Sequence, residues 1–211
     1  MSVRKYTGVR FETAQAAKVL FEAFEEDPLM LATFGNDVWK GDGETLITWI
    51  IWVYFCDDMI DIIVENDGTD DSNIVSVALW EGTHISLSSL YRILIYLFWL
   101  MYRYGFSYTW RLIIFFVSML MKKEQVAPKA YHLSMIGTAS KMQGKGIGSK
   151  ILRHGVSRVS DLGLKCYLES SNPKNVPFYL RNGFRIVEEY YPLENDKETE
   201  GKGPVVTLMM N

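Results

Sequence analysis

The sequence predicts a mixed α/β fold built on a largely antiparallel sheet, and three observations support this class. Short β-rich runs alternate along the chain with longer stretches of helical hydrophobic spacing. Two of the β-rich runs, 60–65 and 74–80, flank the polar loop NDGTDDSN, which is typical of a hairpin. The length of 211 residues is that of one domain, so we expect residues 1–211 to form a single domain.

The N-terminal half contains a short predicted strand over residues 3–9 and two predicted helices, over 13–26 and 44–59, before the hairpin. The first helix carries its apolar residues at helical spacing, so one side of it should be buried. These apolar residues are Ala16, Ala17, Leu20, Phe21 and Phe24.

The C-terminal half begins with two predicted helices within residues 85–123, which meet near Gly105. A strand over 131–138 then leads through a glycine-rich turn into a helix that ends near Leu162. The apolar stripe of this helix is expected to pack on the sheet and comprises Ile151, Leu152, Gly155, Val156, Val159 and Leu162. The remaining elements are a strand over 164–169, a helix over 175–182 closed by Gly183, and strands over 184–191 and 205–210.

Composition excludes several classes of function. A net charge of −3 and a pI of about 5.7 give no basic field for a polyanion, so nucleic acid is not an expected partner. Cys56 and Cys166 are far apart and the three histidines are scattered, so neither a disulfide framework nor a metal site is predicted. The first residues lack the apolar run of a signal peptide, which predicts a cytoplasmic location.

The stretch QGKGIGS contains Gly144, Gly146 and Gly148 at the junction between a strand and a helix. A P-loop requires GxxxxGK followed by Ser or Thr, and both registers fail, because Ala139 replaces the first glycine or Ser149 the second. The dinucleotide fingerprint GxGxxG fails as well, since the run here is GxGxG. A plain connector between strand and helix would need only one glycine.

The unpaired N–H groups and the dipole at a helix N-terminus attract a pyrophosphate, and glycine lets the phosphates approach the backbone. The spacing that fits is Gln143-x-x-Gly146-x-Gly148, followed downstream by Asn172, Phe178, Tyr179, Gly183 and Phe184. Together these two motifs resemble those of the GNAT superfamily of N-acetyltransferases, over residues 130–190. Asn175 stands where that family usually has alanine.

The resemblance implies a GNAT-like sheet of six or seven mostly antiparallel strands, with splayed fourth and fifth strands and a helical insertion at about 85–123. It also implies acetyl-CoA as co-substrate, without a metal. Backbone groups near Ile136 and Thr138 would pair with the pantetheine arm, and the glycine turn would hold the pyrophosphate. The implied cofactor-binding residues are Ile136, Thr138, Gln143, Gly144, Lys145, Gly146, Ile147, Gly148, Ser149, Asn172 and Asn175.

The implied reaction is direct attack of an amine on the thioester, for which a base and an acid are needed. Tyr179 matches the family motif and is the expected acid, although a tyrosine in this pattern can also be a core residue. Glu169, at the end of a strand, is the expected base acting through water, and the alternative is an exposed carboxylate. His132 ranks second as a base, and Cys166 is expected to be buried packing.

Two groups of acidic residues lie outside these motifs. They could bind a cationic amine acceptor, and the alternative is that they are solvated surface residues. The groups are Glu25, Glu26 and Asp27, and Asp57, Asp58 and Asp61.

Residues 85–123 carry five basic residues and no acid. Their two apolar runs are 10 residues each, about half of the ~20 that a spanning helix needs. This segment could pack on the sheet, wall an acceptor pocket, pair protomers in a homodimer, or lie on an anionic membrane surface.

The sequence therefore predicts an acetyl-CoA-dependent N-acetyltransferase that modifies a primary amine of a small molecule or peptide. Two other functions stay open at this point. One is a catalytically silent acyl-CoA-binding sensor, and the other is a membrane-surface interaction protein that uses the basic apolar insertion.

Overall fold

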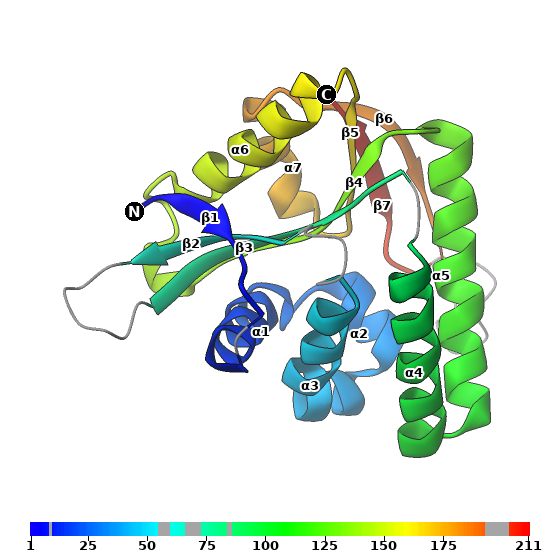
Figure 1. The fold of residues 1–211 in the computed structure, drawn as a ribbon. Helices are drawn as coiled ribbons and strands as arrows, with labels where there is room; N and C mark the ends of the chain where they lie inside the picture. Colours follow the sequence, from blue (N-terminus) through cyan, green and yellow to red (C-terminus); the bar gives the residue numbers. More distant parts are fainter. Residues whose placement is uncertain (9, 55–59, 66–72, 84–85, 193–202) are drawn as a thin grey trace.

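A computed structural model describes residues 1–8, 10–54, 60–65, 73–83, 86–192 and 203–211, and shows a seven-stranded sheet with helices on both faces (Figure 1). The strand order is β1-β2-β3-β4-β5-β7-β6, and the β4–β5 pair is parallel whereas the other neighbours are antiparallel. The predicted mixed fold with a mostly antiparallel sheet is confirmed. The strands are β1 (Val3–Lys5), β2 (Ile60–Glu65), β3 (Asn73–Glu81), β4 (Tyr131–Thr138), β5 (Cys166–Ser170), β6 (Arg185–Tyr190) and β7 (Val206–Met210).

Three helices cover one face of the sheet: α1 (Arg10–Phe24), α2 (Pro28–Phe34) and α3 (Asn36–Tyr54) (Figure 1). The sequence did not predict α2, and it placed the start of α3 eight residues too late, at Glu44 instead of Asn36. Gly43 lies within α3 and allows a close helix contact. A Cβ on Gly43 would come within 2.4 Å of the Phe21 ring on α1. Residues 55–59 of the predicted 44–59 helix lie outside the described residues.

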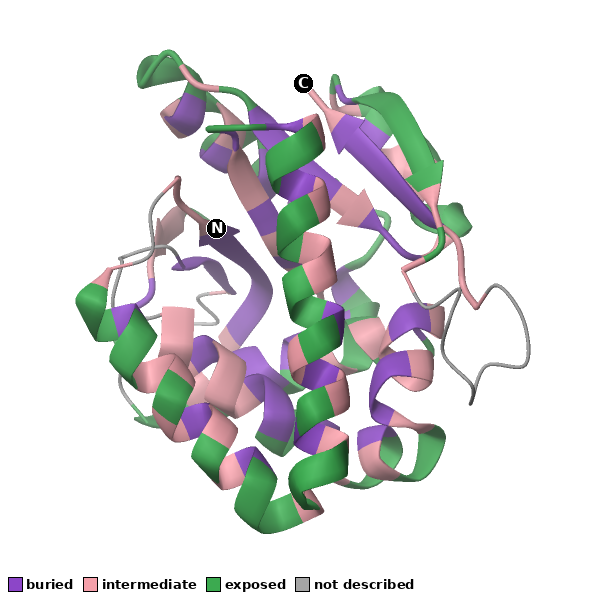
Figure 2. Cartoon of the chain, turned by 90° about the vertical axis from the view of Figure 1, so that its right-hand side faces the viewer, coloured by how far each residue is buried: buried purple, intermediate pink, exposed green. Residues whose placement is uncertain are grey.

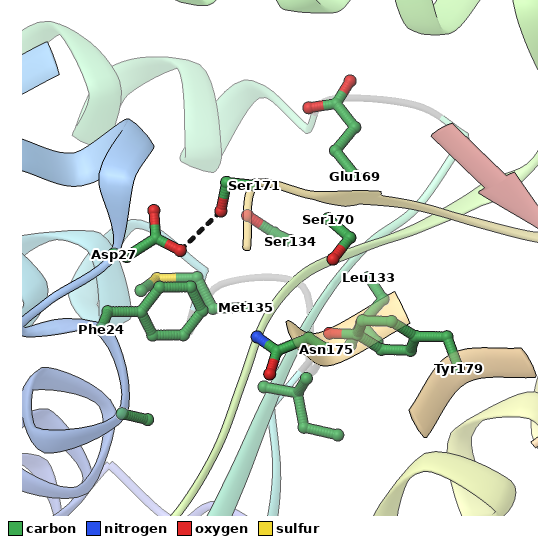
Figure 3. Close-up of a pocket in the computed structure, with 12 residues that line it drawn as sticks. Phe24, Asp27, Leu133, Ser134, Met135, Glu169, Ser170, Ser171, Asn175 and Tyr179 are labelled. Carbon is green, nitrogen blue, oxygen red and sulfur yellow. Dashed lines mark hydrogen bonds between the residues drawn. The ribbon is translucent and has the colours of Figure 1, made fainter. Parts of the chain in front are cut away.

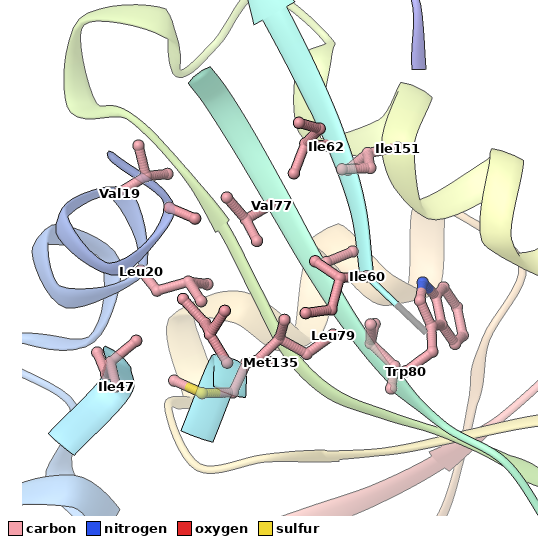
Figure 4. Close-up of a cluster of buried hydrophobic side chains, with 14 of the residues drawn as sticks. Val19, Leu20, Ile47, Ile60, Ile62, Val77, Leu79, Trp80, Met135 and Ile151 are labelled. Atoms are coloured by element: carbon pink, nitrogen blue, oxygen red, sulfur yellow. The ribbon is translucent and has the colours of Figure 1, made fainter. Parts of the chain in front are cut away.

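The opposite face is covered by α6 (Ile147–Asp161), with α7 (Val176–Arg181) beside it (Figure 1). Gly155 of α6 lies directly on the buried ring of Trp80, so close that a Cβ there would come within 2.1 Å of the indole. Figure 4 shows Trp80 and Ile151 on this side of the sheet and Leu20 and Ile47 on the other. The central strands are therefore buried on both faces.

The prediction is wrong for one residue of the apolar stripe on α6. Leu162 is 60% exposed, because α6 ends at Asp161 and Leu162 lies beyond the last helical turn. Val156 is partly buried, and the other members of the stripe are buried as predicted.

The predicted helical pair is confirmed as α4 (Leu87–Tyr104) and α5 (Phe106–Val126), joined at Gly105, whose φ of 88° favours glycine. The pair stands at one end of the sheet (Figure 1). α4 packs on α3 and α5, and α5 packs through Phe115 and Met119 against β5 and β7. Among the helices that the structure describes, none has the length and hydropathy to cross a bilayer.

Candidate active site

β4 and β5 part after a short stretch of parallel pairing. The two strands are in register at three positions, from Tyr131↔Cys166 to Leu133↔Leu168, and pair no further. β4 nevertheless continues to Thr138 and β5 to Ser170. The predicted splay of the fourth and fifth strands is therefore present, and it leaves one edge of β4 without a neighbouring strand.

A β-bulge at Ser134 decides which backbone groups line this free edge. Leu79 and Trp80 on β3 pair with Met135 and Leu133, so Ser134 is an extra residue in β4. Before the bulge, the Tyr131 N–H donates to Lys165 O, on the β5 side, at 2.9 Å.

Beyond the bulge, the Ala139 N–H donates to Val75 O, on the β3 side, at 2.9 Å. Tyr131 and Ala139 are an even number of residues apart, so in an unbroken strand both would point to the same side. Because the bulge reverses the alternation, the backbone groups of Ile136 and Thr138 point into the space between β4 and β5.

The glycine turn joins this edge to the N-terminus of α6. Gly144 and Gly146 have φ values of 75° and 77°, and a Cβ on either would meet no atom within 4 Å. Gly146 is the N-cap of α6 and adopts the left-handed conformation without a side-chain cap. The first N–H groups of this 15-residue helix therefore receive no side-chain cap from Gly146 and have no acceptor within the helix. The Gln143 side chain donates to Thr138 O at 3.1 Å and ties the turn to β4.

Gly148 has a different role from the two glycines before it. A Cβ on Gly148 would lie 3.3 Å from the Thr138 hydroxyl and 3.5 Å from the Phe178 ring. The start of α6, the end of β4 and α7 therefore meet at a glycine. Asn182 also links the two helices, because its amide donates to Ser149 Oγ at 3.1 Å.

A small cavity of about 40 Å³ lies at the inner end of this wedge, with room for a few water molecules (Figure 3). Residues of α1, β4, β5, α7 and the segments between them surround it, and no residue of α4 or α5 lines it. The lining residues are Ala23, Phe24, Asp27, Leu133, Ser134, Met135, Ile136, Glu169, Ser170, Ser171, Asn175 and Tyr179.

Glu169 lines the cavity and is not the exposed strand-end carboxylate that was the alternative. Its Oε1 accepts a hydrogen bond from the Tyr167 hydroxyl at 2.7 Å, whereas its buried Oε2 has no partner among the described residues. Burial raises the pKa of Glu169, and the negative charge of Glu81 adds to the increase, while His132 opposes it. A carboxyl with a raised pKa and a free oxygen is suited to accepting a proton.

His132 stands behind Glu169 and does not line the cavity. Its Nδ1 is 2.8 Å from Glu81 Oε2, and its ring lies 5.4 Å from the Tyr167 ring. Burial would raise the pKa of Glu81, but the hydrogen bond and the charge of His132 outweigh it and lower that pKa.

Cys166 is fully buried, and burial raises its pKa to about 12, so it is packing rather than a nucleophile.

Asp27 is a second buried carboxylate at the cavity, and both of its oxygens are engaged. Oδ1 accepts from the N–H groups of Leu29 and Met30 and caps α2, while Oδ2 accepts from the Ser171 hydroxyl at 2.6 Å (Figure 3). Burial raises the pKa of Asp27 against these hydrogen bonds. Asp27 therefore holds the N-terminal helices against the end of β5.

Tyr179 reaches the cavity from α7, on the opposite side from the Glu169 carboxylate (Figure 3). Burial raises its pKa, and the negative charge of Asp27 adds to this effect. The hydroxyl is therefore protonated throughout the ordinary pH range and can donate a proton.

Some of the other predicted residues lie at the cavity and some do not. Asn175 lines it, whereas Asn172 uses its side-chain oxygen to accept from the Lys174 N–H at 3.1 Å. Lys145 Nζ lies 3.4 Å from the Met142 sulfur, at the turn.

Among the described members of the two acidic groups, only Asp27 lines the cavity. Asp61 is buried between Arg158 and Lys5, Glu26 pairs with Lys40, and Glu25 is exposed. Asp57 and Asp58 lie outside the described residues.

Comparison with known proteins agrees with this geometry. Residues 103–184, which include the glycine turn and Tyr179, match the model of the acetyltransferase (GNAT) family. This part of the chain is therefore similar to GNAT acetyltransferases.

Solved structures of the GNAT fold cover the whole chain. Arylalkylamine N-acetyltransferase 2 from Aedes aegypti superposes with a TM-score of 0.67 at 16% identity, over 100% of this chain and 99% of that one. The polyamine N-acetyltransferase of Drosophila melanogaster, which forms N-acetylagmatine, gives a TM-score of 0.64 at 16% identity, over 100% and 98%.

GNAT proteins use acetyl-CoA, and the wedge fits such a co-substrate on its own features. The backbone groups of Ile136 and the N–H of Thr138 can pair with an extended arm that has amide groups, whereas Thr138 O already accepts from Gln143. The open N-terminus of α6 can receive phosphates without a Cβ in the way at Gly144 or Gly146. Within the described part of the chain, no group of three or more His, Cys, Asp or Glu side chains is arranged to hold a metal ion.

Four polar contributors to the candidate site escaped sequence reasoning. Ser134, Ser170 and Ser171 line the cavity, and Tyr54 of α3 donates to Ser134 Oγ at 2.8 Å. Serine carries no periodic signal, so nothing in the sequence marked these positions. A signal did exist for the role of Asp27, because Asp before Pro28 is an N-cap followed by a favoured first helical residue.

Proposed function

We propose that the chain is an N-acetyltransferase that moves the acetyl group of acetyl-CoA directly to a primary amine of a small molecule or peptide. The single observation that carries this proposal is the free edge of β4 beyond the Ser134 bulge. This edge runs from the α6 N-terminus to a cavity that contains a carboxyl group and a protonated tyrosine.

The co-substrate would lie along β4. Gly144 and Gly146 let the phosphates approach the first N–H groups of α6, and Lys145 adds a positive charge at the turn. Ile136 and Thr138 would bind the arm through their backbone groups, as an added strand would. The reactive end then lies at the cavity, where an N–H of this edge can polarise the carbonyl.

Acetyl-CoA supplies an acetyl group on a thioester, whose carbonyl carbon is the site of attack. Glu169 Oε2 would take one proton from the substrate ammonium, directly or through a water. The freed nitrogen forms the new C–N bond as the C–S bond breaks. Tyr179 would give its proton to the departing sulfur, and the acylated nitrogen would pass its second proton to the Tyr179 oxygen, directly or through solvent, so protons and electrons balance.

Glu169 is a better base than Asp27, because it has an oxygen without a partner whereas both oxygens of Asp27 are committed. Asp27 and Glu169 together would favour a cationic acceptor in the cavity. Phe24, Met135 and Ile136 add an apolar wall that suits the alkyl or aryl part of an amine. The polyamine and arylalkylamine enzymes of similar fold accept molecules of this kind.

Release of free thiol from acetyl-CoA tests the proposed function. The rate should depend on the amine in a screen of polyamines, arylalkylamines, aminoglycosides, amino acids and peptide N-termini. Tight coenzyme A binding without thiol release for any amine would instead identify a sensor.

Replacing Tyr179 with phenylalanine should lower turnover at least tenfold and leave the affinity for acetyl-CoA unchanged, because only the proton donor is lost. Steady-state kinetics and calorimetric binding measure the two effects. Tyr96→Phe is the matched control, since Tyr96 is buried between Trp49 and Trp99 away from the cavity. Unchanged turnover in Tyr179→Phe would remove this residue from the mechanism.

The rate should rise with pH as Glu169 ionises, because only the carboxylate can take a proton. The pKa of Glu169 is raised, so this rise in kcat/KM should lie above the ordinary glutamate value of about 4.3 and below the limb set by the amine.

In Glu169→Gln the rise of kcat/KM at acidic pH should disappear, and kcat should fall by roughly 100-fold. Glu22→Gln, on the exposed side of α1, is the control, and it should keep the pH dependence and the kcat of the unmodified protein. A Glu169→Gln profile identical to that of the unmodified protein would exclude Glu169 as the base.

A further inference from the structure

The outer faces of α4 and α5 carry most of the exposed large apolar side chains of the molecule. Among the described residues, 21 such side chains are exposed, and 14 of them lie on these two helices. Figure 2 looks directly at this end of the molecule and shows exposed residues along the outward faces of both helices.

The exposed residues form a continuous stripe on each helix. On α4, Leu87, Leu94 and Phe98 follow one another at helical spacing, with exposed fractions of 86%, 48% and 66%. On α5, Trp110, Ile114 and Met121 do the same, at 53%, 55% and 59%. Such stripes are normally buried against a partner.

The basic side chains of the helical pair are engaged within the chain or buried. Arg92 donates to Trp52 O, Arg111 to Ala32 O, and Arg103 pairs with Asp42. Lys122 pairs with Glu188 on β6, and Lys123 is buried. Residues 82–123 contain no acid, and the charged residues at the ends of the pair, Arg103 and Glu124, are not members of the apolar stripes.

We propose that a second copy of this chain covers the outer stripes, in a two-fold symmetric dimer in which α4 and α5 of each protomer meet those of the other. About half of a large side chain is on the order of 100 Å², so 14 such side chains present on the order of 1,000 Å². A stable interface needs about 800 Å² from each partner, and a monomer rarely exposes an apolar patch above about 600 Å².

The composition of the stripes favours a protein partner over a lipid surface. Helices that lie on membranes present lysine and arginine to anionic headgroups, whereas the basic residues of this pair are held by partners within the chain. An uncharged centre rich in aromatic residues, leucine and methionine is instead typical of a subunit interface. Two antiparallel helices from each copy would form a four-helix arrangement.

Analytical ultracentrifugation of the full chain tests this inference. The unmodified protein should sediment at twice the chain mass of 24.3 kDa at micromolar concentration. The double variant Leu94→Glu/Phe98→Glu should sediment as a monomer, with a dimer dissociation constant raised by about 100-fold or more. Both side chains are exposed in one chain, so the circular dichroism spectrum should not change.

Leu162→Glu is the matched control, because Leu162 is exposed to a similar extent outside the helical pair and its replacement should leave the dimer intact. A protein that is monomeric at all concentrations, or a double variant that stays dimeric, would overturn the proposal. A monomer that co-sediments with phosphatidylcholine or phosphatidylserine vesicles would also overturn it, in favour of a lipid surface.

Discussion

One extra residue in β4 governs the rest of the site. If β4 ran through Ser134 in regular alternation, without a bulge, the backbone groups of Ile136 and Thr138 would hydrogen-bond to β3, and the edge facing β5 would present different residues. The bulge turns these groups into the wedge at the place where β4 and β5 part. The sheet itself thus provides an unfilled strand position that ends at the glycine turn, and the cavity follows from that opening.

Close contacts at glycines hold the surrounding helices around this opening. Gly137 of β4 lies against α1, where a Cβ would come within 3.0 Å of Ala23, and Gly155 lets α6 sit on Trp80. Gly148 closes the gap to α7 in the same way. The packing of these helices therefore places Asp27 and Tyr179 at the wall of a small cavity. Burial in that cavity raises the pKa values of its acidic groups, and this electrostatic setting suits proton transfer.

The sequence predicted most of the elements, because alternation and helical spacing report burial directly, and its two motifs predicted the GNAT fold. It could not predict the bulge, since an extra serine leaves no periodic signal, nor the position of Asp61, which faces Arg158 under α6. It also missed the first eight residues of α3, which include Gly43 at its close contact with Phe21 of α1. The cavity residues depend on tertiary packing: Glu169 was expected at a strand end, but its burial comes from neighbours distant in sequence.

The central claim is that the turn at the α6 N-terminus binds the phosphates of the co-substrate. Gly146→Leu tests it most directly, with Gly163→Leu as its match, because both glycines have φ near 70–77° and open space at the Cβ. The two variants should lose similar stability, on the order of 1–2 kcal/mol. Calorimetry with acetyl-CoA should show at least tenfold weaker binding for Gly146→Leu and normal binding for Gly163→Leu. Equal affinity in the two variants would contradict the account.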